Sequence, residues 1–396
     1  MNIDYFIRKQ ELNLLNITTD FIRSDYLNIL QSSQKLIGII GSRGVGKTTL
    51  LFQYIELSGQ KALYMSGDDI EFSNSKLYDL VDEFYTLGGR LVVVDEVHKY
   101  RNWTQEIKNI YDTFPDIQIR ISGSSMLNIL YEKYDLSRRL VLHHMKTLSF
   151  REYLELTKGI KLQRYKLQDI LKNSSEISKK LVFEHKDLYA SFKEYLKFGA
   201  YPFFLEGADS FNNKLYNALE KIIHEDIPSL NKIDYSHISI FEKLIYFVVS
   251  ANTPFSVNVA SLSREFGVTE PTLGTYLQIL DKTDIFKSMR KKSKKISKKP
   301  QKLLFSNTNI LYAYADKINL ELDLGVVRET FFVNCFEEIY YSDIGDFVVE
   351  DNIFEVGGRN KTFTQIKDVK NSFLAVDVDF TSNERKVPLW LFGFLY

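Results

Sequence analysis

The sequence has almost no cysteine, with Cys335 alone among 396 residues. An internal disulfide framework and a cysteine-based zinc site are therefore excluded, and a reducing compartment is expected. No stretch approaches the roughly 18 uncharged apolar residues of a membrane span. Asp4, Arg8 and Lys9 interrupt the opening residues, where a secretory signal would be apolar. We therefore expect a cytoplasmic protein without a membrane partner.

An excess of charge of either sign is also missing, because 51 Lys and Arg balance 51 Asp and Glu. The chain as a whole is neither a polyanion binder nor an acidic tail. A binding partner that is recognised by charge must therefore be inferred from local clusters of charged residues. At roughly 150 residues per domain the length predicts two to four domains. The apolar fraction of 44% is enough to give each of them a core.

Short apolar runs alternate with longer amphipathic ones up to about residue 150. The runs are Leu36–Ile40, Ala62–Met65, Leu91–Val94 and Ile117–Ile121. This alternation predicts βαβ units and an α/β fold with a largely parallel sheet.

Three further blocks follow, so that we expect four parts in all. Residues 151–255 have helical spacing and predict a helical lid or connector. Residues 256–302 predict a small helix-turn-helix unit with a lysine-rich segment, and strand-like runs return in 303–396, which predicts a separate α/β domain. The expected division is 1–150, 151–255, 256–302 and 303–396.

A phosphate-binding motif follows the first apolar run. Residues 41–48 match G-x-x-x-x-G-K-[ST] in full and directly precede a helical pattern, which is the context that the motif requires. Its backbone N–H groups wrap an anion, the lysine places a charge on the outer phosphates and the threonine offers a hydroxyl to Mg²⁺. A glycine-rich turn with an incidental lysine is the weaker alternative. The predicted ATP-binding residues are Gly41, Ser42, Arg43, Gly44, Val45, Gly46, Lys47, Thr48 and Thr49.

A pair of acids ends the third apolar run. We expect Asp95, with Thr48, to hold Mg²⁺, and Glu96 to polarise the attacking water as general base. The second carboxylate is what a hydrolysing enzyme needs and a nucleotide carrier does not. A strand that ends in a solvated acidic turn is the alternative.

Two more polar groups are candidates for catalysis. Ser124 or Ser125, after the fourth run, is placed to sense the γ-phosphate, although Ser-Gly-Ser is also an ordinary turn and helix cap. Arg138 and Arg139 are candidates for a cationic finger, acting in cis or from a neighbouring subunit, so an oligomer stays open. Surface arginines are common, which is the alternative reading of this pair.

With these residues, the chain resembles a prokaryotic family of AAA-superfamily ATPases that join a P-loop domain to a winged helix and a C-terminal domain of unknown function. The resemblance runs over nearly the whole length. It is carried by the motifs above and by Asp95–Lys99 with Trp103, Leu148–Leu154, Tyr195–Pro202 and Pro388–Tyr396. It implies a P-loop NTPase fold of the type with an additional strand, together with ATP binding and hydrolysis. The biological role is poorly defined even for the family.

A helix-turn-helix pattern spans residues 259–280, and nine basic residues without an acid follow in Lys287–Lys302, where the wing of a winged helix would lie. Such a cluster would bind DNA phosphates in a salt-dependent manner. Only Thr272, Thr275 and Gln278 are candidate base readers, so we expect backbone contact without sequence specificity. A solvated wing and a module packed against another domain are the alternatives.

The last block carries the spacing of a PD-(D/E)XK nuclease in Asp346 and Glu355, to which Glu329 could add a carboxylate. Gly357 stands where the lysine belongs, and the nearest substitutes are Arg359, Lys361 and Lys367. The block has fifteen acidic and eight basic residues, a net charge of −7 that repels DNA. We therefore expect a restriction-endonuclease-like α/β fold that has lost cleavage.

These observations favour a Mg²⁺-dependent ATPase that repositions its winged helix and C-terminal domain. One form of this hypothesis has the repositioning take place on bound DNA. Two other hypotheses stay open. One is a low-turnover ATP-binding switch that acts through a protein partner, and the other is an ATP-gated nuclease.

Overall fold

The computed structural model describes residues 3–124, 136–228, 233, 235–292 and 300–396. The chain separates into two compact units, Met1–Thr147 and Leu148–Pro228 with Lys232–Tyr396, and each is treated by itself. The expected division into four parts stays a prediction. Among the described residues, no helix combines the length and the apolar character needed to cross a bilayer.

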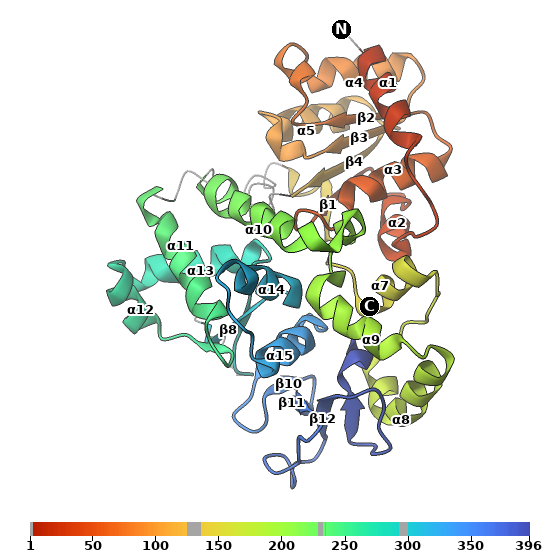
Figure 1. The fold of residues 1–396 in the computed structure, drawn as a ribbon. Coiled ribbons are helices and arrows are strands. Elements are labelled where there is room, and N and C mark those ends of the chain that lie inside the picture. Colours follow the sequence, from red (N-terminus) through yellow and green to blue (C-terminus); the bar gives the residue numbers. More distant parts are fainter. Residues whose placement is uncertain (1–2, 125–135, 229–232, 234, 293–299) are drawn as a thin grey trace. The chain divides into compact units, whose positions relative to one another are not determined.

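The first unit is built on a parallel sheet of five strands (Figure 1). In spatial order they are β2 (Ala62–Ser66), β3 (Leu91–Asp95), β4 (Gln118–Gly123), β1 (Leu36–Ile40) and β5 (Leu140–His144). Strand β4 lies between β3 and β1, so the predicted P-loop fold with an additional strand is confirmed. The helical elements are α1 (Ile3–Leu14), α2 (Ser24–Leu30), α3 (Lys47–Ser58), η1 (Ile70–Ser73), α4 (Leu77–Thr86), η2 (Val97–Lys99) and α5 (Trp103–Thr113).

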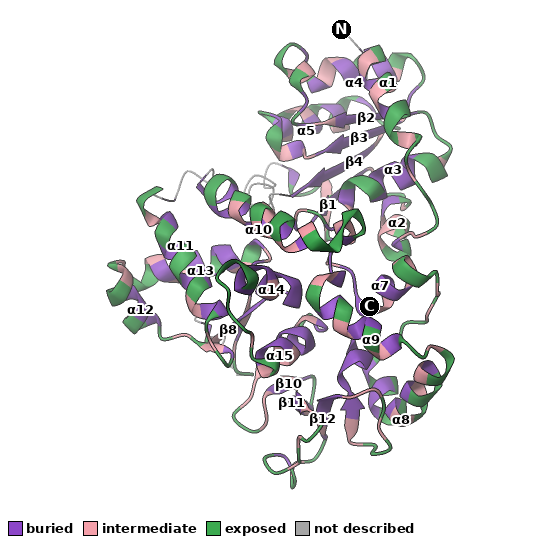
Figure 2. Ribbon diagram, viewed as in Figure 1, coloured by how far each residue is buried: buried purple, intermediate pink, exposed green. Residues whose placement is uncertain are grey.

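Every residue of β1 and β3 is buried, as the purple strands in Figure 2 show. Strands covered on both faces read as continuous apolar runs, which is why the sequence showed them without alternation. The register pairs Leu36 with Leu140 and Ile40 with His144. The loop after Ile40 and the acids after β3 therefore meet at the carboxyl edge of the sheet.

The second unit begins with helices, as the spacing over 151–255 predicts. They are α7 (Phe150–Lys158), α8 (Leu167–Glu184), α9 (Leu188–Glu194), η4 (Tyr195–Gly199), η5 (Pro202–Glu206), η6 (Ala208–Ser210), α10 (Phe211–Lys221), η7 (Ile222–Asp226), η9 (Tyr235–His237) and α11 (Ile238–Val249). A capping box opens α7, because the Glu152 amide donates to Ser149 Oγ over 3.2 Å and the Ser149 amide donates to Glu152 Oε2 over 2.9 Å.

The predicted helix-turn-helix is present as α12 (Val259–Phe266) and α13 (Glu270–Lys282). Gly267, with φ of +68°, makes the turn, and Thr269 caps α13. The strands β6 (Phe255–Ser256), β7 (Phe286–Met289) and β8 (Lys302–Phe305) pair antiparallel in the order β6-β8-β7.

The chain ends in a mixed sheet with helices. Its strands are ordered β13 (Lys386–Pro388), β12 (Ser372–Asp377), β11 (Asn352–Gly358), β10 (Phe347–Val349) and β9 (Tyr340–Tyr341). The helical elements here are α14 (Thr308–Lys317), α15 (Leu324–Asn334) and η10 (Leu389–Phe394). Strand β10 pairs antiparallel with β11, while β11, β12 and β13 run parallel. The predicted return to α/β structure is therefore confirmed.

Candidate functional site

The phosphate-binding loop joins β1 to α3. Gly44 and Gly46 have φ of +81° and +95°, which favours glycine, and a Cβ on Gly41 would lie 2.4 Å from the Met145 carbonyl oxygen. Lys47 is only 5% exposed, and its Nζ donates to the carbonyl oxygens of Gly41 (2.8 Å) and Ser42 (2.9 Å). The ammonium thus lies over the loop, at the N-terminus of a helix whose amides and dipole favour an anion.

Asp95 collects hydroxyl groups from three neighbouring elements. Its Oδ2 accepts hydrogen bonds from Thr48 Oγ1 (2.6 Å) and Tyr64 OH (2.9 Å), and its Oδ1 accepts one from Ser122 Oγ. Only 2% of Asp95 is exposed. Burial, and then the Asp95 charge, raises the pKa of the Tyr64 phenol, which stays a donor. A carboxylate and a hydroxyl in contact are hard oxygen donors, so the pair fits Mg²⁺.

Glu96 is held in a single orientation. Its backbone has φ of +46°, and its Oε2 accepts hydrogen bonds from the Ser124 amide (3.2 Å) and the Ser124 hydroxyl (2.8 Å). His98 Nδ1 lies 3.5 Å from the same oxygen. Burial, and then the charges of Lys99 and Arg43, lower the pKa of His98 to about 3. The imidazole is therefore neutral near pH 7 and forms no ion pair with Glu96.

Residues 33–154 match the family model of an AAA domain. The match covers the loop, the acid pair and all five strands of the first sheet. Over these residues the chain is similar to AAA domains, and the term AAA domain is used below for this range. The resemblance found in the sequence is thereby confirmed for this part of the chain.

The rest of the chain has less informative relatives. Residues 189–321 match a domain of unknown function. An uncharacterized protein of Methanocaldococcus jannaschii is 30% identical over 316 residues, which are 74% of this chain and 65% of the relative. The chain thus spans less than two thirds of that relative's length.

Two solved structures are similar at 14% identity. The Walker-type ATPase of Pyrococcus abyssi matches with a TM-score of 0.41 over 76% of this chain and 99% of that one. The RuvB Holliday junction branch migration motor of Thermotoga maritima matches with a TM-score of 0.29 over 81% of this chain and 95% of that one. Both likenesses are distant and add nothing to the fold defined by the strand order.

The AAA domain places the two candidate arginines away from its own phosphate loop. Arg138 and Arg139 precede Leu140, which pairs with Leu36 at the amino edge of the sheet, whereas the loop follows Ile40 at the carboxyl edge. Four residue steps separate the edges by about 13 Å. Arg139 also forms a bidentate pair with Asp112, both distances being 2.9 Å. This position does not favour a finger that acts in cis on this loop. The finger role of Arg138 and Arg139, in cis or on a neighbouring subunit, stays a prediction.

The serine after β4 has a contact that the sequence did not indicate, while its role as a sensor of the γ-phosphate stays a prediction. Ser124 contacts Glu96 and so orients the general-base candidate, while Ser125 lies outside the described residues. Sequence reasoning missed Tyr64 and Ser122, both of which contact Asp95. Their signal was weak, since it consists only of a polar group near the end of a strand that neighbours β3.

Most of the described lysines in the basic segment, residues 287–302, contact other groups of the protein. Lys287 donates to the carbonyl oxygens of Val333 and Phe336, Lys291 pairs with Asp343 (2.7 Å) and Lys292 with Asp351 (3.1 Å). Lys302 Nζ lies 4.0 Å from the ring centroid of Tyr341. Residues 293–299 lie outside the description. These contacts with the acidic C-terminal block favour packing between modules as one role of the segment.

A second constellation forms on β10, β11 and α15. Glu355 is 1% exposed, its Oε1 lies 2.8 Å from Lys361 Nζ, and its buried Oε2 has no hydrogen-bond partner. Asp346 Oδ2 accepts from the Val356 amide over 2.7 Å. Burial, and then Asp346, raise the pKa of Glu329 to about 8. Buried acids with perturbed pKa values are typical of functional sites, so these acids are candidates for one.

Gly357 explains how Lys361 reaches Glu355. A Cβ on Gly357 would lie 2.7 Å from Lys361 Cδ, so the missing side chain leaves the space in which the lysine runs. Of the three substitutes considered from the sequence, Lys361 is the one that contacts Glu355. A lysine from outside position 357 thus contacts the carboxylate of Glu355.

Proposed function

We propose that the AAA domain binds ATP with Mg²⁺ and hydrolyses it. The observation that carries the proposal is the 2.6 Å contact between Thr48 Oγ1 and Asp95 Oδ2, at the N-terminus of the helix that bears Lys47. In this proposal Thr48 and Asp95 hold Mg²⁺, which neutralises charge on the phosphates. Lys47 leaves the two loop carbonyls and pairs with the outer phosphates.

The hydrolytic step is assigned to Glu96. Its carboxylate would accept a proton from the attacking water, and the two hydrogen bonds from Ser124 would fix the oxygen that does so. Neutral His98 packs beside it without contributing charge. In this proposal ATP hydrolysis drives a conformational change of the winged helix and the C-terminal domain. One form of the proposal has this change take place on bound DNA.

Steady-state hydrolysis with and without DNA tests the proposal, with Lys47→Ala as the inactive reference. Turnover that Lys47→Ala abolishes supports an ATPase, and stimulation by DNA supports the DNA-linked version. Tight binding with negligible turnover supports the regulatory switch that acts through a protein partner. Residues 231–234 read Asn-Lys-Ile-Asp, an order by which GTPases read guanine, so GTP must be assayed beside ATP.

Few side chains of the helix-turn-helix are available to contact DNA bases. The hydroxyls of Thr272 and Thr275 are engaged with Thr269 and the Pro271 carbonyl, which leaves Gln278 exposed as a base reader. Binding through the wing would be to the backbone and would weaken steeply with salt.

A second candidate function is metal-dependent cleavage of phosphodiesters by Glu329, Asp346, Glu355 and Lys361. The contact between Lys361 and Glu355 favours it, since it removes the objection raised by Gly357. The net charge of −7 on residues 303–396 still opposes DNA unless metal ions compensate. A cleavage assay with Mg²⁺ or Mn²⁺ should compare Glu355→Ala and Lys361→Ala with the exposed control Lys367→Ala. Cutting that survives Glu355→Ala excludes this site, and no cutting by the parent protein supports the expected loss.

A further inference from the structure

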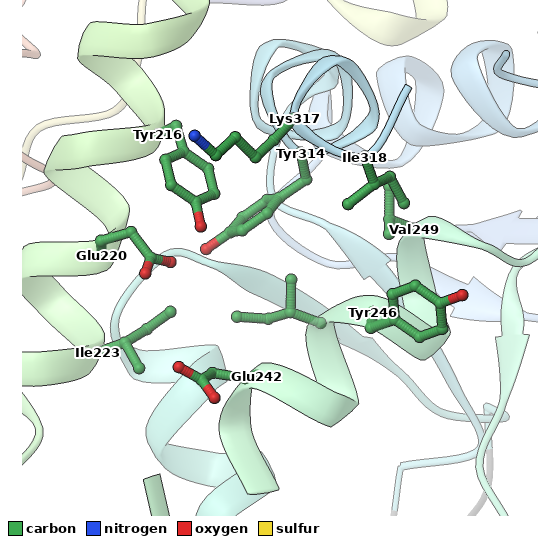
Figure 3. A pocket seen from close by; sticks show the side chains of 10 residues that line it. Tyr216, Glu220, Ile223, Glu242, Tyr246, Val249, Tyr314, Lys317 and Ile318 are labelled. Atoms are coloured by element: carbon green, nitrogen blue, oxygen red, sulfur yellow. The ribbon is translucent and has the colours of Figure 1, made fainter. Parts of the chain in front are cut away.

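A cavity of about 250 Å³ opens in the second unit among α10 with η7, α11 and α14 (Figure 3). Its wall is largely apolar and aromatic, with Ile223, Ile245, Val249 and Tyr246 among the lining residues. Two carboxylates, Glu220 and Glu242, enter it from different helices. The cavity lies wholly within the residues that match the domain of unknown function.

His224, whose side chain is 45% exposed, lies beside these two carboxylates. Its Nε2 lies 3.3 Å from Glu220 Oε2 and 3.3 Å from Glu242 Oε1, and all three donor atoms lie within 4.8 Å of one another. Zinc bonds of about 2.0–2.2 Å in a tetrahedron place donor atoms about 3.3–3.6 Å apart. Glu220 and His224 stand four residues apart on consecutive helical turns, and Glu242 on α11 supplies the third donor.

An independent observation points to a ligand at the same place. Tyr314 is 6% exposed, and its buried hydroxyl has no hydrogen-bond partner. Figure 3 shows this hydroxyl directed into the cavity beside Tyr216 and Glu220, and the Tyr216 and Tyr314 rings meet edge to face with centroids 5.4 Å apart. A buried hydroxyl without a partner is costly, so the geometry leaves a position for one polar atom within the cavity.

We propose that Glu220, His224 and Glu242 bind a divalent transition-metal ion, with Zn²⁺ the best match, and that the fourth ligand, a water or another small oxygen donor, is hydrogen-bonded by Tyr314. Two carboxylates and one neutral imidazole balance a divalent charge, and imidazole with carboxylate is a donor set that suits zinc. Three protein ligands with one open position facing an apolar cavity are typical of a site that binds or polarises a small molecule. The proposal does not depend on nucleotide binding by the AAA domain.

The test uses the full-length protein after removal of metal by chelation. Titration with Co²⁺ should give one equivalent with the visible absorption of a tetrahedral cobalt ion, and Zn²⁺ should displace it. His224→Ala should abolish the signal, and the near-isosteric Glu242→Gln should weaken binding at least tenfold. His185→Ala, at a partly exposed histidine outside the cavity, should leave it unchanged.

Two further variants keep the result interpretable. Glu355→Ala removes the other acidic constellation and should leave the tetrahedral signal intact, whereas Tyr314→Phe should retain cobalt but alter the spectrum of the bound ion. Zn²⁺ should raise the melting temperature of the parent protein and not that of His224→Ala. The proposal is overturned if no equivalent binds, if His224→Ala binds normally, or if Glu355→Ala alone removes the signal.

Discussion

The hydrogen bonds from Ser124 to Glu96 make a sharp prediction about catalysis. Ser124→Ala removes the 2.8 Å hydroxyl bond and leaves the 3.2 Å amide bond to the same oxygen. A hydrogen bond to a charged group contributes about 1.5–3 kcal/mol. Because one of the two donors remains, we expect the lower end, which corresponds to a kcat about tenfold lower with little change in KM.

Glu96→Gln removes the base itself and should lower kcat by about 10²–10⁴-fold while ATP binding is preserved. If Ser124 acts through Glu96, the two substitutions are not additive, and Ser124→Ala should cost almost nothing in the Glu96→Gln background. A serine that contacts the γ-phosphate directly, as the sequence first indicated, would lower the rate in both backgrounds.

The assay is steady-state phosphate release for the four proteins of this double-mutant cycle, with ATP affinity measured separately by calorimetry. A tenfold loss that multiplies with the effect of Glu96→Gln would refute the positioning role of Ser124. Unchanged turnover in Glu96→Gln would remove Glu96 from the mechanism altogether.

Three further predictions concern stability and the arginines. The pKa of His98 is about 3 in the folded state and 6.5 in the unfolded state, so the unfolded state binds more protons between these pH values. The free energy of unfolding should therefore fall as the pH falls from 6.5, by at most about 3 kcal/mol at pH 4. His98→Asn should flatten this pH dependence in denaturant titrations. The pKa of Glu329 is about 8 in the folded state and 4.5 in the unfolded state, so the metal-free protein should lose stability as the pH rises from 4.5 to 8. If the melting temperature of Glu329→Gln shows the same pH dependence, Glu329 is not its source. Arg139→Ala breaks a partly exposed ion pair with Asp112, so the free energy of unfolding should fall by about 1 kcal/mol or less. The kcat of a monomer should not change. A large fall in that kcat would support an arginine finger that acts in cis.

The sequence by itself determined the elements whose chemistry is contiguous along the chain. The loop at 41–48, the acids at the end of β3 and the helix-turn-helix at 259–280 each depend on residues a few positions apart, so their spacing was sufficient. The parallel sheet followed from apolar runs that are buried on both faces. The loop, the acid pair and the helix-turn-helix can be read from the sequence because the turns and the helical hydrogen bonds that they require are local, whereas the sheet is indicated by burial and not by its long-range pairing.

Only the tertiary structure decided the groups that meet across elements. Strand register places Arg138 and Arg139 before β5, at the amino edge of the sheet. A missing side chain at Gly357 lets Lys361 reach Glu355, and helix packing brings His224 to Glu242. None of these contacts has a period or a fixed spacing in the chain. Each depends on which surfaces pack together, and packing is selected by the burial of whole helices and strands, which no short segment of sequence encodes.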